Sequence, residues 1–275
     1  MALKIYQPIT AARRGTSVSK DKEVLSRDRK SKRLVFGKKR DVGRSRGKIS
    51  TRHKGGGEKR LLRKVDFKLD KFEIPAKVLR LEYDPNRTAY LAFIGFADGE
   101  KRYILAPLNL KVGESVLISQ NQIEVKTGNR MPLKYIYPGT FVHNIELMPQ
   151  HGAKLCRAAG SYAVVKVHEN ELTQLQMPSG EIRLVDSRSK ATVGQVSREE
   201  WDLVRFGKAG RMRHRGIRPT VRGKAMNPVD HPHGGGEGHS PIGLVHPKTP
   251  WGKPALGVKT RKAKKWTNKY ILKRR

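Results

Sequence analysis

The sequence predicts a mostly β protein in which an OB-like barrel is followed by an SH3-like barrel, with long irregular basic extensions at both ends. Three observations predict this class. Charge is uneven along the chain, the middle carries short apolar runs separated by turn residues, and both ends are poor in apolar residues. We expect a basic N-terminal extension over residues 1–64, the OB-like barrel over 65–129, the SH3-like barrel over 130–200, and a basic C-terminal extension over 201–275.

The charge distribution indicates the class of partner. The 275 residues include 59 Lys and Arg against 24 Asp and Glu, a formal net charge of +35. Residues 1–64 carry net +17, residues 65–200 net +2, and residues 201–275 net +16. A surplus this large favours a polyanionic partner, with nucleic acid as the leading candidate and an anionic membrane surface as the alternative. The two extensions have the composition of segments that order on binding, whereas the middle has that of a folded domain.

The first barrel is predicted from five short β-type runs. Asp84-Pro85-Asn86 and Asp98-Gly99-Glu100 are turn sequences between apolar runs, as in a meander of antiparallel strands. Few helical signals interrupt about 65 residues, which favours a small closed barrel. The expected strands are Ala76–Tyr83, Ala89–Ala97, Lys101–Leu105, Ser115–Ser119 and Gln122–Lys126.

A second set of strands follows the break at Pro138-Gly139. Its size fits an SH3-like barrel, and Pro178-Ser179-Gly180 predicts the turn of a hairpin. Ser197-Arg198-Glu199-Glu200 has the pattern of a capping box and predicts one short helix. The expected strands are Phe141–Met148, Tyr162–His168, Leu172–Met177, Glu181–Asp186 and Ala191–Val196.

Several classes of protein are disfavoured by the sequence. Cys156 is the single cysteine, so no disulfide can form within the chain and a reducing compartment fits. No apolar run approaches the ~18 residues of a membrane span. Gly55-Gly56-Gly57 lacks the spacing of a phosphate-binding P-loop, because no Ser or Thr follows Lys59. We therefore predict no membrane insertion and no nucleotide cofactor.

Glycines mixed with basic residues mark both extensions. Arg44–Lys48, Arg52–Arg60 and Gly207–Gly216 are the densest such stretches. Lysine and arginine neutralise phosphates, arginine in bidentate fashion, and glycine lets two backbones approach closely. A solvated disordered tail is the alternative, but three consecutive glycines favour a backbone threaded against another backbone.

The loop Met226–Gly238 is the most distinctive stretch. Two prolines and four glycines in thirteen residues exclude a regular helix or strand. A metal site would use His231, His233 and His239 with Glu237 or Asp230, but no matching Cys or His pair has zinc-site spacing. Catalysis by Asp230 and His231 is disfavoured because no nucleophile and no enclosed pocket accompany them. Insertion into folded RNA, where amides and imidazoles meet phosphates and base edges, is the favoured interpretation.

With these motifs the chain resembles the bacterial-type ribosomal protein L2 family of the large subunit. The resemblance covers roughly residues 40–275 and is most specific in Met226–Gly238. The other matching motifs are Thr51–Gly57, Glu82–Arg87, Asp98–Pro107, Ala191–Gly194, Gly207–Arg211, Arg218–Gly223 and Thr249–Gly252.

The resemblance implies a non-enzymatic component of the large ribosomal subunit. Its implied partners are large-subunit rRNA, other ribosomal proteins and, through an inter-subunit contact, the small subunit, with no membrane and no homo-oligomer. It implies a role in subunit association and in organising RNA near the peptidyl transferase centre, with His231 as an RNA-organising residue. It implies no catalytic residue, metal or cofactor, and a cytoplasmic, ribosome-bound location, with an organellar ribosome as the alternative. A free-standing RNA-binding or chaperone-like protein is the rival function.

The motifs and the resemblance together define a set of expected rRNA-binding residues. The turn residues Arg87 and Arg157 match RNA contacts of the family; ordinary surface arginines are the alternative there. The full set is Arg44, Arg46, Lys48, Arg52, His53, Lys54, Gly55, Gly56, Lys59, Arg60, Arg87, Arg157, Lys208, Arg211, Arg213, Arg218, Arg222, Asn227, Asp230, His231, His233, Gly235, Trp251 and Lys262.

Three positions depart from the family pattern. Glu58 stands where the family usually has histidine, and its negative charge disfavours a phosphate contact there. His214 replaces a usual tryptophan, which removes an expected stacking surface, and His239 replaces a usual basic residue.

Overall fold

The chain forms two compact units, and each unit is built from segments that are far apart in the sequence. A computed structural model describes residues 3–26, 31–38 and 43–274. Unit 1 comprises Met1–Lys39, Lys59–Arg211 and Lys269–Arg275, and unit 2 comprises Arg40–Glu58 and Met212–Asn268. The predicted division into four consecutive segments stays a prediction.

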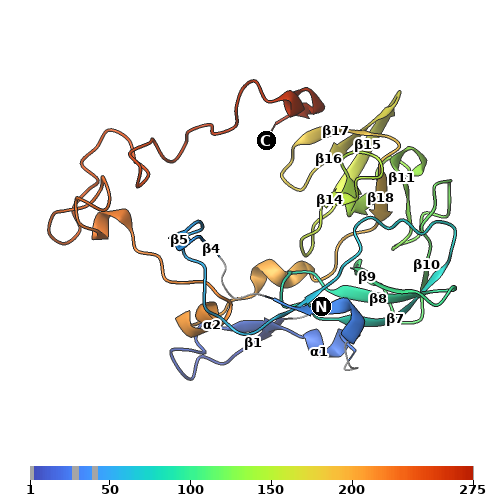
Figure 1. Cartoon of the computed structure of the whole chain (residues 1–275), viewed down its shortest axis with the longest axis horizontal. Helices are drawn as coiled ribbons and strands as arrows, with labels where there is room; N and C mark the ends of the chain where they lie inside the picture. Colours follow the sequence, from blue (N-terminus) through green and yellow to red (C-terminus); the bar gives the residue numbers. More distant parts are fainter. Residues whose placement is uncertain (1–2, 27–30, 39–42, 275) are drawn as a thin grey trace. The chain divides into compact units, whose positions relative to one another are not determined.

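A four-stranded antiparallel sheet forms the first half of unit 1 (Figure 1). Its strands, in spatial order, are β10 (Ser115–Val116), β7 (Ala76–Glu82), β8 (Leu91–Phe96) and β9 (Lys101–Leu105). Strand β8 is buried on both faces: Ala92, Ile94 and Phe96 enter one hydrophobic cluster, while Leu91 and Phe93 enter another. Side chains alternate between the faces of a strand, so burial of both faces explains why β8 is apolar throughout.

A seven-stranded antiparallel sheet forms the second half. It is organised around a third cluster that includes Met131, Val142, Val165, Leu175 and Val185. In spatial order its strands are β11 (Arg130–Pro132), β18 (Lys190–Val193), β12 (Phe141–His143), β15 (Ala163–Glu169), β16 (Leu172–Gln176), β17 (Ile182–Asp186) and β19 (Ile271–Lys273). The last strand comes from the C-terminal end of the chain and pairs with β17, so this end belongs to unit 1.

Short ribbons and single turns of helix complete the described structure. The ribbons pair β1 (Leu3–Ile5) with β2 (Ser17–Ser19), β3 (Val35–Gly37) with β6 (Leu61–Arg63), β13 (Ile145–Glu146) with β14 (Ala153–Leu155), and β4 (Arg44–Ser45) with β5 (Lys48–Ile49). The α-helices are α1 (Asp21–Val24) and α2 (Ala209–His214). The 3-10 turns are η1 (Lys32–Leu34), η2 (Leu133–Tyr135), η3 (Glu199–Leu203), η4 (Gly223–Ala225) and η5 (Trp266–Tyr270). Among the described residues, no helix has the length and apolar character needed to cross a bilayer.

The predicted fold class, mostly β with curled, barrel-like sheets, is confirmed, but three local predictions are wrong. Residues 122–126 form no strand, because the carbonyl of Glu124 accepts hydrogen bonds that fold a loop. The predicted strand over 141–148 is broken at Asn144, whose φ is 51°. No capping box forms before η3: its N-cap is Arg198, without a side-chain cap, and the Ser197 hydroxyl accepts from the Tyr90 amide.

Part of the predicted N-terminal extension belongs to unit 1 and packs on its core. The Asp21 carboxylate accepts from the Tyr90 hydroxyl at 2.5 Å and from Arg198 at 2.9 Å, and Val24 and Leu25 pack against the first hydrophobic cluster. Burial raises the pKa of Tyr90 above its ordinary range, so its hydroxyl stays a donor to Asp21. The segment around α1 is therefore an integral part of the fold.

Candidate nucleic-acid interface

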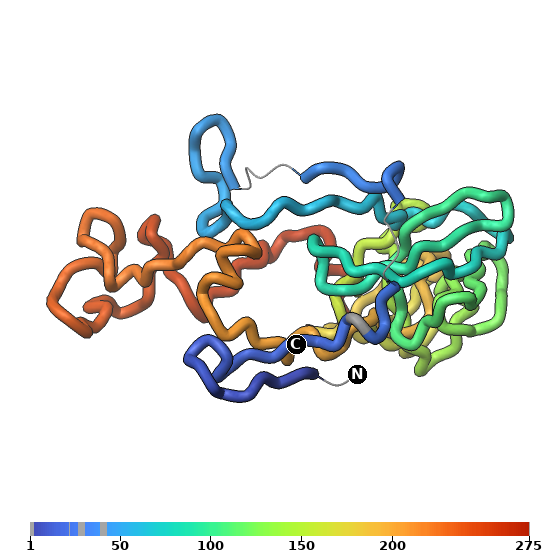
Figure 2. The backbone as a smooth tube through the Cα atoms, turned by 90° about the horizontal axis from the view of Figure 1, so that it is seen from below, coloured from blue at the N-terminus to red at the C-terminus, as the bar shows by residue number. Residues whose placement is uncertain are grey.

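In unit 2, residues 53–58 and residues 214–218 pair as a short antiparallel segment, which we call the clasp. The amide of Gly55 donates to the carbonyl of Gly216, Glu58 to His214, and Arg218 to His53, each at 3.0 Å. Figure 2 shows these two segments side by side. The triple glycine thus lies against a backbone, as predicted, but that backbone belongs to the same chain.

Gly57 makes this clasp possible. Its φ is +99°, and a Cβ added there would lie 2.8 Å from the amide nitrogen of Gly216 and 2.9 Å from the carbonyl oxygen of His214. Any side chain at Gly57 would therefore collide with backbone atoms and would adopt a conformation that L residues rarely take. The sequence requirement here comes from protein packing within unit 2.

A basic hollow lies at the clasp. It measures about 210 Å³ and is lined by Gly43, Arg44, Ile49, Thr51, Arg52, His53, Lys54, Arg218 and Pro219. None of these lining residues is acidic. The His53 ring is held by a 3.2 Å contact from Nδ1 to the Pro219 carbonyl oxygen, so this nitrogen carries the proton. The hollow therefore presents cations and glycine backbone, the chemistry that suits a phosphate.

Arg52 also contacts an aromatic side chain. Its guanidinium lies 4.9 Å from the ring centroid of Trp251, which is 72% exposed. Cation–π contact of this kind orients an arginine while leaving its donors accessible. The expected site residues Arg52 and Trp251, 199 positions apart, are thus brought together.

The two departures Glu58 and His214 contact each other. The His214 Nδ1 lies 3.0 Å from a Glu58 carboxylate oxygen, and the two backbones are bonded at the same place. Both side chains are exposed, at 66% and 70%. The negative charge of Glu58 therefore lies against a side chain of the protein. The two departures from the family pattern are compatible because each provides the contact of the other.

The distinctive loop folds upon itself around His231. The His231 imidazole is 7% exposed, and its Nδ1 accepts a 2.9 Å hydrogen bond from the amide of His233. The carbonyl of His231 accepts from Gly234, and the carbonyl of Met226 accepts from Gly235. The loop contains no regular helix or strand, as predicted. The imidazole therefore acts as an internal support of the loop.

Close packing around the loop depends on two glycines. A Cβ on Gly223 would lie 2.5 Å from the His231 ring, and a Cβ on Gly234 would lie 2.2 Å from the Asn227 carbonyl oxygen. The second imidazole is also engaged, because His233 Nε2 accepts from the Lys248 amide at 2.8 Å.

Among the described residues, no cluster of three or more His, Cys, Asp or Glu side chains could hold a metal.

In unit 1, the two turn arginines meet on one aromatic ring. The guanidinium groups of Arg87 and Arg157 lie 5.6 Å and 4.6 Å from the ring centroid of Phe67. Arg87 is also bonded to Asp84 at 2.6 Å, whereas Arg157 is exposed. The two residues thus form a single basic spot although they are 70 positions apart.

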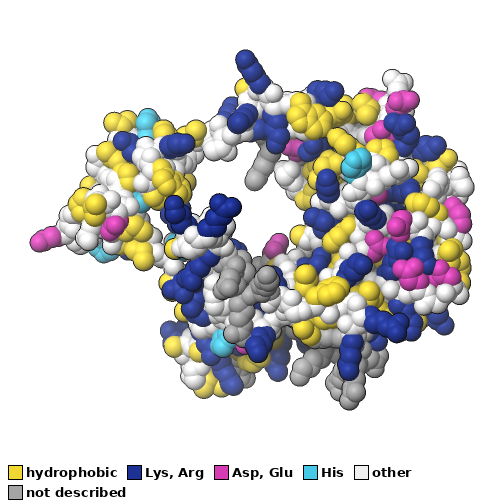
Figure 3. Space-filling view, viewed as in Figure 1, with side chains coloured by type: hydrophobic (Ala, Val, Ile, Leu, Met, Phe, Trp, Pro, Cys, Tyr) yellow, Lys and Arg dark blue, Asp and Glu magenta, His cyan; other side chains and the backbone are white. Residues whose placement is uncertain are grey.

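The acidic residues of unit 1 are largely paired with its own cations. Arg102 bonds Asp66, Asp70 and Glu100, and Lys71 bonds Asp98. The hydrogen bond from Arg102 holds the pKa of Asp70 below its ordinary value, and the bond from Lys71 does the same for Asp98. Figure 3 shows Lys and Arg spread widely over the visible face, with most Asp and Glu on unit 1. Internal pairing lessens the repulsion that these carboxylates would exert on a polyanion.

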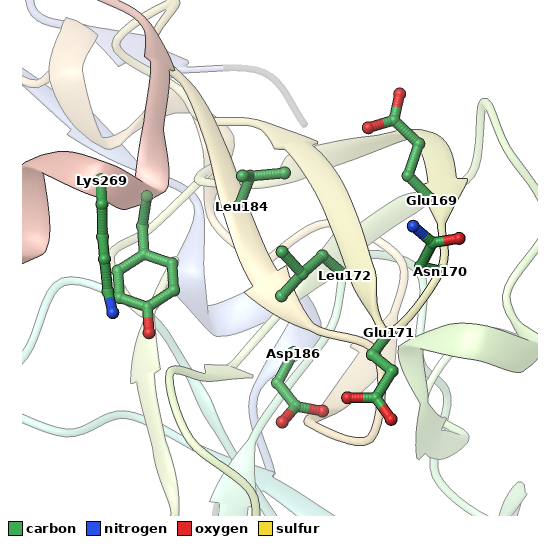
Figure 4. Close-up of a pocket in the computed structure, with 8 residues that line it drawn as sticks. Glu169, Asn170, Glu171, Leu172, Leu184, Asp186 and Lys269 are labelled. Carbon is green, nitrogen blue, oxygen red and sulfur yellow. The ribbon is translucent and has the colours of Figure 1, made fainter.

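A larger hollow on unit 1 has the opposite character. It measures about 580 Å³ and is lined by Glu169, Asn170, Glu171, Leu172, Leu184, Asp186, Lys269 and Tyr270 (Figure 4). Its lining includes three carboxylates and one lysine, and Asp186 is already bonded to Arg188 at 2.9 Å. The excess of negative charge makes this hollow unsuited to phosphates.

The expected site residues divide between the units. Unit 2 holds Arg44, Arg46, Lys48, Arg52, His53, Lys54, Gly55, Gly56, Arg213, Arg218, Arg222, Asn227, Asp230, His231, His233, Gly235, Trp251 and Lys262. Unit 1 holds Lys59, Arg60, Arg87, Arg157, Lys208 and Arg211. The β3–β6 ribbon, with its exposed Phe36 and Leu62, lies in the predicted irregular N-terminal extension, where we expected no strands. The available signal was the short apolar run at Leu34-Val35-Phe36 and the pair Leu61-Leu62.

Two family models match the chain. Residues 31–118 match the model described as Ribosomal Proteins L2, RNA binding N-terminal domain. Residues 126–252 match the model described as Ribosomal Proteins L2, C-terminal domain. The two matches together cover most of the chain, including the clasp and the His231 loop.

Proposed function

Because the chain belongs to the ribosomal protein L2 family, we propose that its two units bind large-subunit rRNA as a structural, non-catalytic component that organises RNA near the peptidyl transferase centre and supports subunit association. The family itself implies a structural, RNA-binding role in the large ribosomal subunit. The location near the peptidyl transferase centre and the inter-subunit contact are part of our proposal. Other ribosomal proteins and the small subunit are the remaining expected partners.

The observation that carries the proposal is the basic clasp of unit 2. It gathers Arg44, Arg52, Lys54 and Arg218 around a hollow whose described lining residues carry no carboxylate. Phosphates neutralise such a cluster, and glycine at the clasp lets an RNA backbone come near the protein backbone. Recognition of this kind depends on the shape of folded RNA more than on base order.

The His231 loop supports a structural role over a catalytic one. Its Nδ1 is used by the His233 amide, and the ring is enclosed against Gly223. A general base needs an accessible nitrogen within reach of a substrate proton. We infer that His231 sets the shape of the loop that contacts RNA.

The test is incorporation into large subunits. A triple variant, Arg52→Ala, Lys54→Ala and Arg218→Ala, removes three cations from the hollow. We expect it to co-sediment poorly with large subunits after a moderate salt wash and to leave those subunits impaired in joining small subunits. The matched control removes three exposed lysines of unit 1, Lys111→Ala, Lys126→Ala and Lys166→Ala. Equal retention of the two triple variants would contradict a specific role for the clasp, and loss of the wild-type protein in the same wash would contradict stable ribosomal incorporation.

A further inference from the structure

The β3–β6 ribbon of unit 1 is packed at its Val35–Arg63 pair and exposed at the next pair, Phe36–Leu62. Register places Val35 opposite Arg63 and Phe36 opposite Leu62. Val35 packs on a hydrophobic cluster, and Arg63 is 2% exposed and paired with Glu82 and Asp84. Directly opposed residues point to the same side of a ribbon. Phe36 and Leu62 therefore share the other face, where they are 51% and 39% exposed.

This ribbon is held in place by the neighbouring turn. The Asn86 side-chain amide donates to the carbonyl of Leu61 at 2.7 Å, and an Arg60 guanidinium N–H donates to the carbonyl of Pro85 at 3.2 Å. The amide of Lys38 continues the pairing by donating to the carbonyl of Arg60. The exposed face is therefore fixed before any partner binds, which lowers the entropic cost of using it.

Three basic residues occupy ladder positions next to the exposed Phe36–Leu62 pair. The ladder places Lys38 opposite Arg60 one step along the same face, and Lys64 is two residues beyond Leu62. Within the described part of the chain, no carboxylate forms an ion pair with Lys38, Arg60 or Lys64. Lys38 Nζ contacts the neutral Asn86 side chain instead, at 3.2 Å.

We propose that Phe36 and Leu62 form a stacking platform for an unpaired base of the RNA, with Lys38, Arg60 and Lys64 meeting the flanking phosphates. An exposed aromatic side chain with basic residues at adjacent ladder positions fits single-stranded nucleic acid, whose bases stack on aromatic side chains while cations neutralise the backbone. A protein partner would have to desolvate three unpaired cations to cover two apolar side chains. A duplex would not offer a free base face. This inference rests on the proposed function and specifies which part of an RNA the ribbon takes.

The experiment compares single-stranded and paired RNA. Full-length wild type, Phe36→Ala, Phe36→Leu and Phe36→Tyr are titrated with a single-stranded RNA of about 20 nucleotides, a duplex of equal length, and large-subunit rRNA. We expect Phe36→Ala to weaken single-strand binding roughly 5- to 100-fold, with the duplex unaffected and the salt slope unchanged. Phe36→Tyr keeps a π-face and retains affinity, whereas Phe36→Leu keeps apolar cover without a π-face and loses it.

The control is Tyr137→Ala, which truncates an aromatic residue that is 62% exposed elsewhere on unit 1. Equal losses for Phe36→Ala and Tyr137→Ala, or full retention by Phe36→Leu, would overturn the platform. The platform would also be overturned if the Phe36→Ala variant bound RNA normally but large subunits assembled with it lacked a neighbouring protein. The ribbon would then belong to a protein interface. Failure of the wild type to bind large-subunit rRNA would instead refute the proposed function.

Discussion

Unit 1 and unit 2 are built on different physical principles. Unit 1 contains three hydrophobic clusters, and strand β8 is buried on both faces between two of them. In unit 2, His231 is the one buried side chain among the described residues. What unit 2 has instead is backbone pairing, glycine-dependent close packing and a high density of cations. Apolar burial is the main source of folding free energy, so the two units should differ sharply in how they depend on RNA.

Backbone complementarity can shape a segment without making it stable alone. A net hydrogen bond contributes only about 1 kcal/mol, whereas ordering each residue costs about 1–2 kcal/mol. Unit 2 is therefore expected to need an external contribution, and we propose that neutralisation of its cations by phosphates supplies it.

The largest expected effect is that of salt on RNA binding. With roughly six to ten phosphate contacts, affinity for large-subunit rRNA should fall ~10³–10⁵-fold between about 50 and 200 mM salt. Filter binding or fluorescence anisotropy over this range measures the slope. A flat response would mean that apolar or base contacts, and not the basic segments, dominate binding.

A core substitution in unit 1 should come next. Ile94 is fully buried in β8, so Ile94→Ala should lower the free energy of unfolding by about 2–5 kcal/mol through lost burial and a cavity. Urea unfolding followed by circular dichroism measures it. Val112→Ala, at a position 53% exposed, is the matched control and should change stability by less than about 0.5 kcal/mol. Equal losses of stability in the two variants would contradict an apolar core around β8.

Acid should weaken unit 1 through His143. Burial lowers the pKa of His143 to about 4, and its Nδ1 is bonded to the carbonyl of Gly194. Between pH 6.5 and 4 the unfolded chain binds a proton at this residue that the folded chain does not. The stabilisation is therefore complete above pH 6.5 and is lost as pH falls toward 4, by about 1.4 kcal/mol per pH unit.

Urea midpoints at pH 6.5 and pH 5 test this dependence, above the range where carboxylates titrate. His143→Gln should be less stable at both values but should show a weaker decline between them. An equally steep decline in the variant would assign the pH dependence to other groups.

The smallest effect is a local one at Gly57. Gly57→Ala introduces a Cβ against the Gly216 backbone at positive φ and should weaken rRNA binding at least about fivefold, or roughly 1 kcal/mol. Gly47→Ala is the control, because Gly47 also has positive φ but has nothing within 4 Å of the added Cβ. The melting of unit 1 should be the same in both variants. Identical binding by both would show that backbone conformation, and not the clasp, matters at Gly57.

The barrel-like sheets could be predicted from sequence because their determinants are local. Turn residues such as Asp98-Gly99 fix where a meander reverses, and Lys101–Leu105 was predicted with the bounds that the structure has. The break at Asn144 could not be predicted, because it reflects a left-handed residue inside an apolar run. The strand β19 was also missed, since its pairing with β17 joins residues far apart in sequence.

The candidate site was predictable in composition but not in arrangement. Glycines between cations indicated close backbone approach near phosphates, and the structure adds that Gly57 approaches Gly216. The pairing of Glu58 with His214 joins residues 156 positions apart, which no local pattern encodes. For the same reason the meeting of Arg87 and Arg157 on Phe67 could be found only in three dimensions.

The most direct test is amide hydrogen exchange of the full-length protein with and without large-subunit rRNA. We predict slow exchange of the amides in β7, β8 and β9 in both states. Amides of the clasp and of the His231 loop should exchange rapidly in the free protein and become protected on binding. Slow exchange of the clasp and loop amides in the RNA-free protein would contradict this dependence of unit 2 on RNA, above all if their protection disappears in one cooperative thermal transition.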